Sequence, residues 1–328
     1  MPNKRQPRHG SMQVWPRKRA ARAYPRIRGW ANSSEKKALG FAGYKVGMTH
    51  VLIVNNVKAS RTKGEEISAP VTIIECPPLK VAGIKVYTNT SYGLKPKTQI
   101  NAKNVDKELV ERKISNPKKH NEENLAKLTE KDFDSLSLVV YTQPKLINLK
   151  KKPEIFEISI GGSKEDQLSY AKEKLGKEIA VSDVFAEGNQ VDIHSVTKGH
   201  GFQGPMRRFG ITKRRHKSEK SIRNPGSLGS WCGQGHYMYR IAHAGQHGYH
   251  TRTEYNKQIL KIGDKPDEVN VSGGYLHYGN VKNHFIMLRG SVGGTAKRLI
   301  RFNTATRPNH KITKEAPQIT FISTGSKQ

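Results

Sequence analysis

The chain has 328 residues, and its 58 Lys and Arg against 27 Asp and Glu give a formal net charge of +31 at pH 7. Hydrophobic residues make up 34%, against the roughly 45–50% that is typical of soluble domains when Gly is also counted. We expect no membrane span and no secretory leader, because the sequence has no apolar run long enough for either. The two cysteines, Cys76 and Cys232, exclude a disulfide framework. A basic, apolar-poor chain indicates a polyanionic partner, and nucleic acid is the commonest one.

The positive charge is concentrated in three segments. Residues 1–37 hold 11 Lys and Arg and one acid, residues 198–261 hold 13 and two acids, and residues 279–314 hold eight and no acid. Residues 103–189 instead balance 16 Lys and Arg with 16 acids. An ordinary solvated surface intersperses charges of both signs, as residues 103–189 do. The three basic segments therefore predict contact with nucleic acid.

The first basic segment, residues 1–37, is expected to be an extended arm. Its four prolines at near-regular spacing disfavour helix and sheet. Trp15, Tyr24 and Trp30 lie between arginines, an arrangement suited to stacking on exposed bases. A disordered tail is the alternative. The residues of the arm predicted to bind RNA are Lys4, Arg5, Arg8, His9, Trp15, Arg17, Lys18, Arg19, Arg22, Arg26, Arg28 and Trp30.

Short runs rich in β-branched residues and bounded by Gly, Pro or Asn indicate strands of a small barrel or sandwich. They are Gly43–Val54, Val71–Cys76, Val81–Thr88, Glu154–Ile160, Gln190–Thr197 and Gln318–Ser323. Because these runs are far apart in sequence, we expect residues 38–95 and 186–328 to form one discontinuous core. The long basic stretches would then emerge from that core.

Residues 95–185 are expected to form a peripheral α/β insertion that faces solvent. Residues 103–136 and 163–176 have a helical pattern with charges of mixed sign. The second helix is predicted to begin at Ser163, which has Asp166 three residues on in a variant of the capping box, and a glycine predicts its end.

The second basic segment, residues 198–261, is expected to be a finger that RNA orders. It contains 10 glycines and few aliphatic residues, so it cannot build its own core. Glycine permits close backbone approach, and dense cations supply phosphate contacts. The finger residues predicted to bind RNA are Arg207, Arg208, Lys213, Arg214, Arg215, His216, Lys217, Arg223, Trp231, His236, Arg240, His243, His247, His250 and Arg252. Those of the C-terminal stretch are Arg289, Lys297, Arg298, Arg301, Arg307 and Lys311.

Three motifs that suggest other chemistry are not favoured. Residues 199–204 spell GxGxxG, but the segment that follows Pro205 predicts no amphipathic helix for a dinucleotide fold. His243, His247 and His250 have metal-ligand spacing without nearby cysteine or clustered carboxylates. Cys232 could act as a nucleophile with a histidine base, but the sequence indicates neither an acid to orient that base nor a substrate pocket. We therefore predict no catalytic residue, cofactor or metal. A free RNA-processing enzyme and a DNA-binding protein are the competing classes.

Several motifs carry a family resemblance. They are GFQGPMRRFG at residues 201–210, RRHK at 214–217, PGSLGSW at 225–231 and GQHGYHTRT at 245–253, together with PRHGSMQVWPRKRA in the arm and GFAGYKVGMTH in the first strand. In these motifs the whole chain resembles the universal ribosomal protein three family of the large subunit. The long insertion and Trp231 are similar to the archaeal and eukaryotic branch. The lack of a long basic C-terminal tail favours the archaeal type.

This resemblance implies a mainly β fold, with a six-stranded Greek-key barrel like that of translation proteins. It implies that the arm and finger enter large-subunit rRNA, and that Trp231 lies at a fingertip near the peptidyl-transferase region. A tryptophan buried in a protein core is the alternative for Trp231. The resemblance also implies a non-enzymatic, early-assembly role, with one copy per ribosome in the cytoplasm. The implied partners are rRNA and neighbouring ribosomal proteins, with no membrane and no small-molecule substrate.

Overall fold

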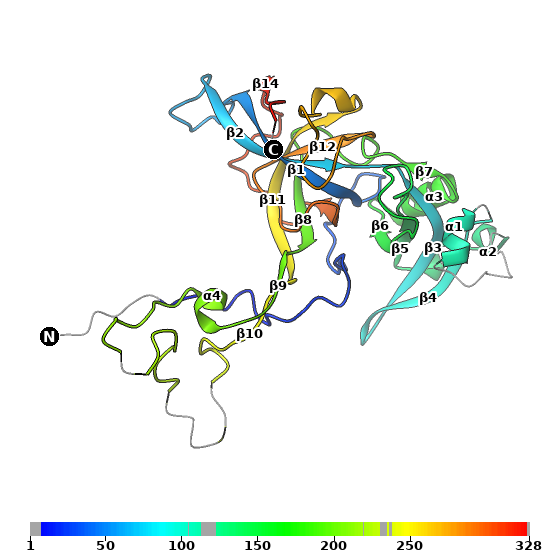
Figure 1. Ribbon diagram of the computed structural model, residues 1–328. Coiled ribbons are helices and arrows are strands. Elements are labelled where there is room, and N and C mark those ends of the chain that lie inside the picture. Colours follow the sequence, from blue (N-terminus) through cyan, green and yellow to red (C-terminus); the bar gives the residue numbers. More distant parts are fainter. Residues whose placement is uncertain are drawn as a thin grey trace. The chain divides into compact units, whose positions relative to one another are not determined.

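The chain divides into two compact units in the computed structural model, which describes residues 8–103, 105–112, 123–218, 220–229, 235 and 238–326. We call Tyr24–Ser195 with Thr253–Gln328 the barrel unit. Met1–Ala23 with Val196–Arg252 form the extension unit. Each unit thus combines segments that are far apart in sequence, as the colours of Figure 1 show.

The described part of the chain is mainly β (Figure 1). Its strands are β1 (Gly40–Val54), β2 (Glu66–Glu75), β3 (Leu79–Thr90), β4 (Gly93–Asn101), β5 (Ser135–Tyr141), β6 (Ile155–Ser159), β7 (Glu178–Ile179), β8 (Gln190–Val196), β9 (Gly199–Gln203), β10 (Gly245–Gly248), β11 (Thr251–Gly263), β12 (Phe285–Arg289), β13 (Leu299–Thr304) and β14 (Ile319–Ile322). The helices are α1 (Lys107–Arg112), α2 (Glu123–Ala126), α3 (Lys164–Lys174) and α4 (Pro205–Phe209), with 3-10 turns at Glu130–Asp132 and Pro266–Glu268. No helix among the described residues has the length and apolar character needed to cross a membrane.

The largest sheet has the strand order β13-β8-β11-β12-β2-β1-β14, and β13 also pairs with β1. That extra pairing joins the two ends of a six-strand path, which removes free edges from it. The long first strand makes this possible, because Gly40–Tyr44 pair with β13 while Val51–Ile53 pair with β14. The mainly β core expected from the sequence is confirmed.

The large sheet buries apolar side chains on both faces. Neighbouring residues such as Ile73 and Ile74, or Ile286 and Met287, belong to two different hydrophobic clusters. Successive side chains of a strand point to opposite faces, so each strand contributes to both clusters. One of the two clusters continues into the insertion through residues such as Leu138, which ties the two sheets of the barrel unit together.

The second sheet belongs to the insertion, and it corrects two strand assignments. Its order is β4-β3-β5-β6, with β7 paired to β3. Val81–Thr88 and Glu154–Ile160, predicted as core strands of the barrel, lie in β3 and β6 of this sheet. The alternating apolar pattern indicates a strand, but it does not say which sheet the strand joins.

The helix predicted near residue 163 is confirmed. The Ser163 hydroxyl accepts a hydrogen bond from the Asp166 amide, and the Asp166 carboxylate accepts one from the Ser163 amide, which together form a capping box at the start of α3. The helical pattern at 103–136 is only partly testable, because residues 104 and 113–122 lie outside the described residues. α1, α2 and a 3-10 turn occur in the remainder.

The second half of the predicted arm packs onto the barrel unit instead of remaining an exposed strip. The Tyr24 hydroxyl donates to the Ile155 carbonyl at 3.1 Å, and Ile27 is buried. Trp30, predicted to bind RNA, is partly buried and packs against the hydrophobic cluster. Its indole is thus largely engaged by protein.

Arg301 also differs from its prediction as an RNA contact, because it is only 2% exposed. Its guanidinium donates to the Pro25 carbonyl at 3.2 Å and to the Glu157 carbonyl at 2.5 Å, and it lies 4.3 Å from the centre of the Phe156 ring. Burial lowers the pKa of Arg301 to about 9, so the side chain still carries its charge at neutral pH. Arg301 therefore fastens the arm to the insertion inside the protein.

We predict that Arg301→Met lowers the free energy of unfolding by about 2–4 kcal/mol, because buried carbonyls lose a charged donor. Arg307→Met, at an exposed arginine of the same stretch, is the matched control and should cost less than about 0.5 kcal/mol. Urea titration of the full chain measures both. Equal stability of Arg301→Met and the unmodified protein would contradict the structural role.

Candidate nucleic-acid interface

The extension unit begins with two hydrogen bonds between Thr197 and His250. The Thr197 amide donates to the His250 carbonyl at 2.9 Å, and the His250 amide donates to the Thr197 hydroxyl at 3.1 Å. Strands β9 and β10 then form a two-stranded ribbon. Gly248 has φ +73°, and a Cβ there would lie 2.0 Å from the Lys198 carbonyl oxygen. Only glycine fits this close crossing of the two chain segments.

The short helix α4 points the side chains of its two neighbouring arginines, Arg207 and Arg208, in different directions. Pro205 occupies its first turn, where no intrahelical amide donor is needed, and Gly210 ends it with φ +69°. Arg207 is exposed, whereas Arg208 is partly buried. The Arg208 guanidinium donates to the carbonyls of Gln246 and His243, both at 3.0 Å. It thereby satisfies main-chain acceptors of the segment that returns from the finger.

The N-terminal arm lies against this same helix. Arg17 donates to the Arg208 carbonyl at 2.9 Å, and its guanidinium lies 4.2 Å from the centre of the Phe209 ring. The Trp15 ring packs edge-on against Phe209 and Tyr239, with centroid distances of 6.5 and 5.4 Å. Trp15 and Arg17 were predicted to bind RNA, but the described contacts of both are within the extension unit.

Main-chain contacts also hold the arm to the finger. The Ala20 amide donates to the Tyr249 carbonyl at 2.8 Å. The His250 Nδ1 lies 2.9 Å from the Lys18 carbonyl, so this nitrogen carries the proton and donates. His250 is only 6% exposed, which corrects its prediction as an RNA contact. The arm and the finger are thus one folded piece.

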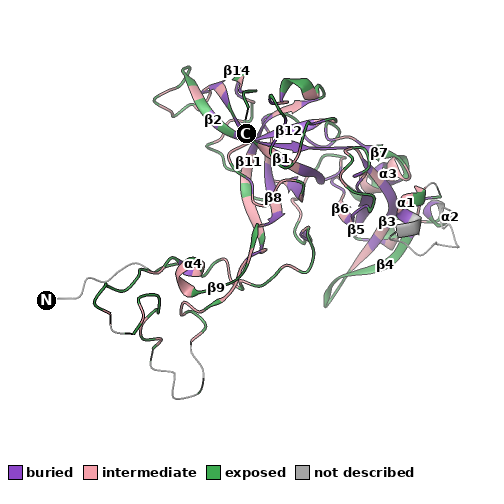
Figure 2. Ribbon diagram, viewed as in Figure 1, coloured by how far each residue is buried: buried purple, intermediate pink, exposed green. Residues whose placement is uncertain are grey.

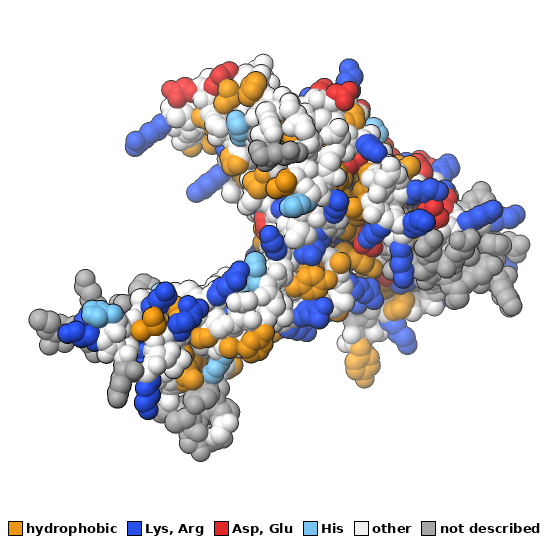
Figure 3. All heavy atoms as spheres, in the orientation of Figure 1, with side chains coloured by type: hydrophobic (Ala, Val, Ile, Leu, Met, Phe, Trp, Pro, Cys, Tyr) orange, Lys and Arg blue, Asp and Glu red, His pale blue; other side chains and the backbone are white. Residues whose placement is uncertain are grey.

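Most of the other described cations of the extension unit are exposed to solvent. The unit has 18 Lys and Arg in its sequence against one acid, Glu219, which lies outside the described residues. Every ion pair among the described residues falls in the barrel unit. Figure 3 shows Lys and Arg side chains along the extension, in a view where the acids gather on the barrel unit. Burial and the charges of Arg208, Arg252 and Arg8 lower the pKa of Arg17, which shows how closely the cations crowd.

The predicted residues of the arm and finger fall into three groups. The exposed members are Arg8, His9, Lys18, Arg19, Arg22, Arg26, Arg28, Arg207, Lys213, Arg214, Arg215, His216, Lys217, Arg223 and Arg240. The partly or fully buried members are Trp15, Arg17, Trp30, Arg208, His243, His247, His250 and Arg252. Lys4, Arg5, Trp231 and His236 lie outside the described residues.

The extension unit is nearly without a core. Among its described residues only Val196, Phe209, Gly248 and His250 are buried, and Figure 2 shows the rest as exposed or intermediate. Charged side chains and backbone hydrogen bonds thus replace apolar burial there. The predicted finger also ends earlier than residue 261, because β11 continues into the barrel unit and buries Ile259 and Leu260.

The C-terminal basic stretch is part of the large sheet rather than a separate strip. Arg289 ends β12, and Arg301 lies within β13. Lys297 and Lys311 are exposed, and Arg307 lies 5.3 Å from the centre of the Tyr255 ring. The sequence counts could not separate these positions, since a strand interior and a surface loop contribute equally to a segment's charge.

Two exposed aromatic residues were not predicted as contacts. Phe202 is 76% exposed on β9, and Tyr239 is 68% exposed beside Trp15. Both stand in glycine-rich or basic sequence, and this aromatic–basic alternation is the signal that could have identified them.

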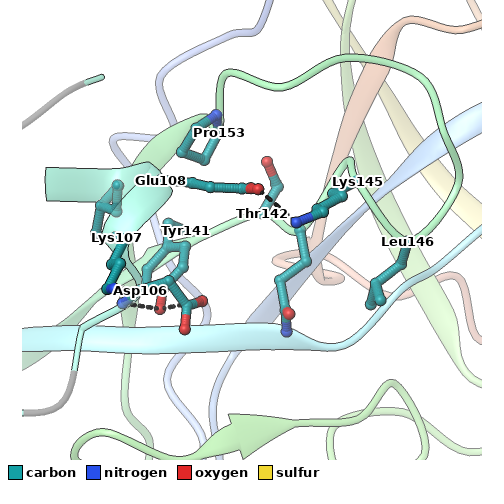
Figure 4. Close-up of a pocket in the computed structure, with 10 residues that line it drawn as sticks. Asp106, Lys107, Glu108, Tyr141, Thr142, Lys145, Leu146 and Pro153 are labelled. Atoms are coloured by element: carbon teal, nitrogen blue, oxygen red, sulfur yellow. Dashed lines mark hydrogen bonds and ion pairs between the residues drawn. The ribbon is translucent and has the colours of Figure 1, made fainter. Parts of the chain in front are cut away.

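No three His, Cys, Asp or Glu side chains in the described ranges gather closely enough to hold a metal ion. A surface pocket of about 330 Å³ lies in the insertion beside α1 (Figure 4). There the Tyr141 hydroxyl donates to Asp106 at 2.8 Å, and Lys145 pairs with Glu108 at 2.9 Å. These groups partner one another and connect α1 to the end of β5.

We predict that Arg208→Gln loosens the extension unit, since it leaves the carbonyls of His243 and Gln246 without their donor. Losing about 1.5 kcal/mol raises the open population roughly tenfold. The rate of chymotrypsin cleavage of the full chain after Phe209 measures the open population, and in the Arg208 variant it should rise by roughly tenfold. Arg207→Gln, at the exposed neighbour, is the control and should cleave at the unmodified rate. Equal cleavage of both variants would contradict the role of Arg208.

The partly buried His247 and the buried His250 provide a pH test. Burial first, and then His200, Arg207 and other nearby cations, lower the pKa of His247; burial and nearby arginines also lower the pKa of His250. The folded extension therefore prefers neutral imidazoles. Their contribution to stability is present above the unfolded pKa of about 6.5 and is lost as pH falls below it. NMR titration of the full chain should give midpoints below 6.5 for both, and midpoints above 6.5 would contradict the packing.

Comparison with known proteins agrees with the sequence motifs. The profile described as Ribosomal protein L3 matches residues 1–328. The large ribosomal subunit protein uL3 of Archaeoglobus fulgidus is 44% identical over 327 residues, which cover 98% of each chain. Those of Methanobrevibacter smithii and Methanosphaera stadtmanae are 46% and 47% identical over 333 residues, with the same coverage. The names of these archaeal relatives describe them as proteins of the large ribosomal subunit. The chain belongs to the ribosomal protein L3 family.

Proposed function

We propose that this protein is a structural component of the large ribosomal subunit whose extension unit binds large-subunit rRNA. The observation that carries this proposal is the charge of the extension unit, which holds 18 Lys and Arg against one acid and forms no ion pair among its described residues. Such a surface repels itself in the free protein. A polyanion relieves that repulsion, and released counterions add to the free energy of binding.

The arrangement of the arginines supports an RNA-binding surface that is folded before RNA binds. Arg17 and Arg208 hold the arm to the finger, which leaves Arg207 and the run Lys213–Lys217 facing outward. Phosphate contacts fix position, and exposed aromatic rings such as Phe202 can stack on unpaired bases. The inward arginines thus preorganise the surface that the outward cations present.

The finer role follows from the family resemblance. We propose that the fingertip with Trp231, which lies outside the described residues, approaches rRNA near the peptidyl-transferase region. We also propose an early role in subunit assembly, which the family resemblance implies. The barrel unit would then form the solvent-side body, as a Greek-key barrel of the translation-protein type. Neighbouring ribosomal proteins are the further partners, and each cytoplasmic ribosome would hold one copy.

The salt dependence of rRNA binding tests this proposal. Replacing Lys213, Arg214, Arg215 and Lys217 together with Gln should reduce the slope of log K against log[salt] by roughly 3, because each phosphate contact contributes about 0.7–0.9. Filter binding of the full chain to deproteinised large-subunit rRNA measures the slope.

The matched control replaces four exposed lysines of the insertion, Lys131, Lys151, Lys152 and Lys172, with Gln. It removes the same charge from a surface that balances both signs, so its slope should change by less than about 1. A control slope that falls as much as the finger variant's would show a non-specific charge effect and would overturn the assignment of the contact to the extension unit.

A further inference from the structure

The ribbon formed by β3 and β4 ends in exposed residues. The two strands pair from Gly83 with Asn101 to Thr90 with Gly93, so only two residues form the tip. Gly93 has φ +100°, which closes the turn and leaves Tyr92 at its end. Residues 91–99 are all exposed, and β4 is an edge strand of its sheet.

The sequence of the β3–β4 ribbon carries lysines and no acids. Residues 76–105 contain five lysines and no acid. Lys80, Lys85 and Lys97 form ion pairs with Asp106, Glu157 and Asp132. Lys95, next to the tip, has no acidic partner within the described ranges. Segment totals of charge hid this feature, because it falls between the arm and the neutral insertion.

The tip carries apolar surface that the protein itself does not bury. Tyr92 is 101% exposed and Leu94 is 63% exposed. Tyr92 contributes nothing to folding by burial, and Leu94 contributes little, because most of its surface remains in contact with water. An aromatic side chain next to an unpaired lysine is the combination that binds nucleic acid by stacking and by phosphate contact.

The edge of the ribbon disfavours a protein strand as its partner. Pro96 offers no amide donor, and Lys95 and Lys97 flank it on the edge strand. These residues oppose the addition of another β-strand. The charge of the ribbon instead complements a polyanion.

Arg26, an arm residue predicted from the sequence to bind RNA, lies near the base of the ribbon. Tyr87 is paired in register with Pro96, beside Lys95. Burial and Glu157 raise the pKa of Tyr87, and the charge of Arg26 opposes that rise, which places this arm residue near the base of the ribbon. Arg26 and the ribbon both belong to the barrel unit, so their proximity does not depend on the extension unit.

We propose that the tip of the β3–β4 ribbon is a second rRNA contact, separate from the extension unit, in which Tyr92 stacks on an unpaired base and Lys95 contacts a phosphate. The inference rests on the proposed function, since it takes large-subunit rRNA as the ligand. It adds the β3–β4 ribbon, most of which the sequence assigned to the 38–95 core, to the RNA-binding part of the molecule.

A double variant tests the contact in the full chain. Tyr92→Ala with Lys95→Gln should weaken binding to deproteinised large-subunit rRNA at least fivefold and lower the salt slope by about 1. Leu146→Ala with Lys152→Gln removes an exposed apolar group and a charge elsewhere on the insertion, and should leave affinity unchanged. Tyr92→Phe alone keeps the ring and should bind like the unmodified chain. A Tyr92/Lys95 variant that binds like its control would overturn the inference while leaving the proposed function intact. Failure of the unmodified chain to bind would overturn both.

Directed probing identifies the class of partner. Tyr92→Cys in a Cys232→Ser background gives one reactive thiol at the tip, because Cys76 is buried. An iron–EDTA tether on that thiol, in subunits reconstituted with the full chain, should cleave the rRNA at a few neighbouring nucleotides. Cleavage confined to a neighbouring protein would overturn the inference in favour of a protein contact.

Discussion

The fold of the extension unit depends on finding hydrogen-bond donors for main-chain carbonyls that no neighbouring strand can reach. In the described part of the segment that returns from the finger, the four-residue strand β10 pairs with β9, and few other backbone groups have main-chain partners. A carbonyl without a donor costs free energy whenever it leaves water. Arg208 supplies the donors for His243 and Gln246, and Arg17 does the same for Arg208 itself. Guanidinium groups thus hold the segments of the extension unit together, whereas apolar packing holds the barrel unit together.

This use of arginine divides the cations into two sets with different tasks. Arg207 and Arg208 are adjacent in sequence, yet one faces solvent and the other faces backbone, because one helical step turns the side chain by about 100°. Arg301 extends the same division to the barrel unit, where it joins the arm to the insertion through carbonyls. The charge of a segment therefore indicates a polyanionic partner, but the direction of each side chain decides which cations can reach it.

The sequence was sufficient for features that depend on local chemistry. The capping residues Ser163 and Asp166 predicted the start of α3, and alternating apolar runs located β1, β2 and β8. Contacts between residues that are far apart in the sequence were not predictable in this way. Val81–Thr88 has the same alternation as a barrel strand, and only its pairing with β4 and β5 places it in the insertion. The docking of Trp15 on Phe209 was hidden for the same reason, since an aromatic residue among arginines suits a base and a protein ring equally well. The basic ribbon escaped notice because its lysines are spread over two strands.

A high-resolution structure of this protein within its large subunit tests most directly whether inward arginines build the extension while outward cations bind rRNA. It should show the guanidinium groups of Arg17 and Arg208 on protein carbonyls, and those of Arg207, Arg214 and Arg215 within hydrogen-bonding distance of phosphate oxygens. Phosphates bound by Arg17 and Arg208, with the arm separated from α4, would contradict it.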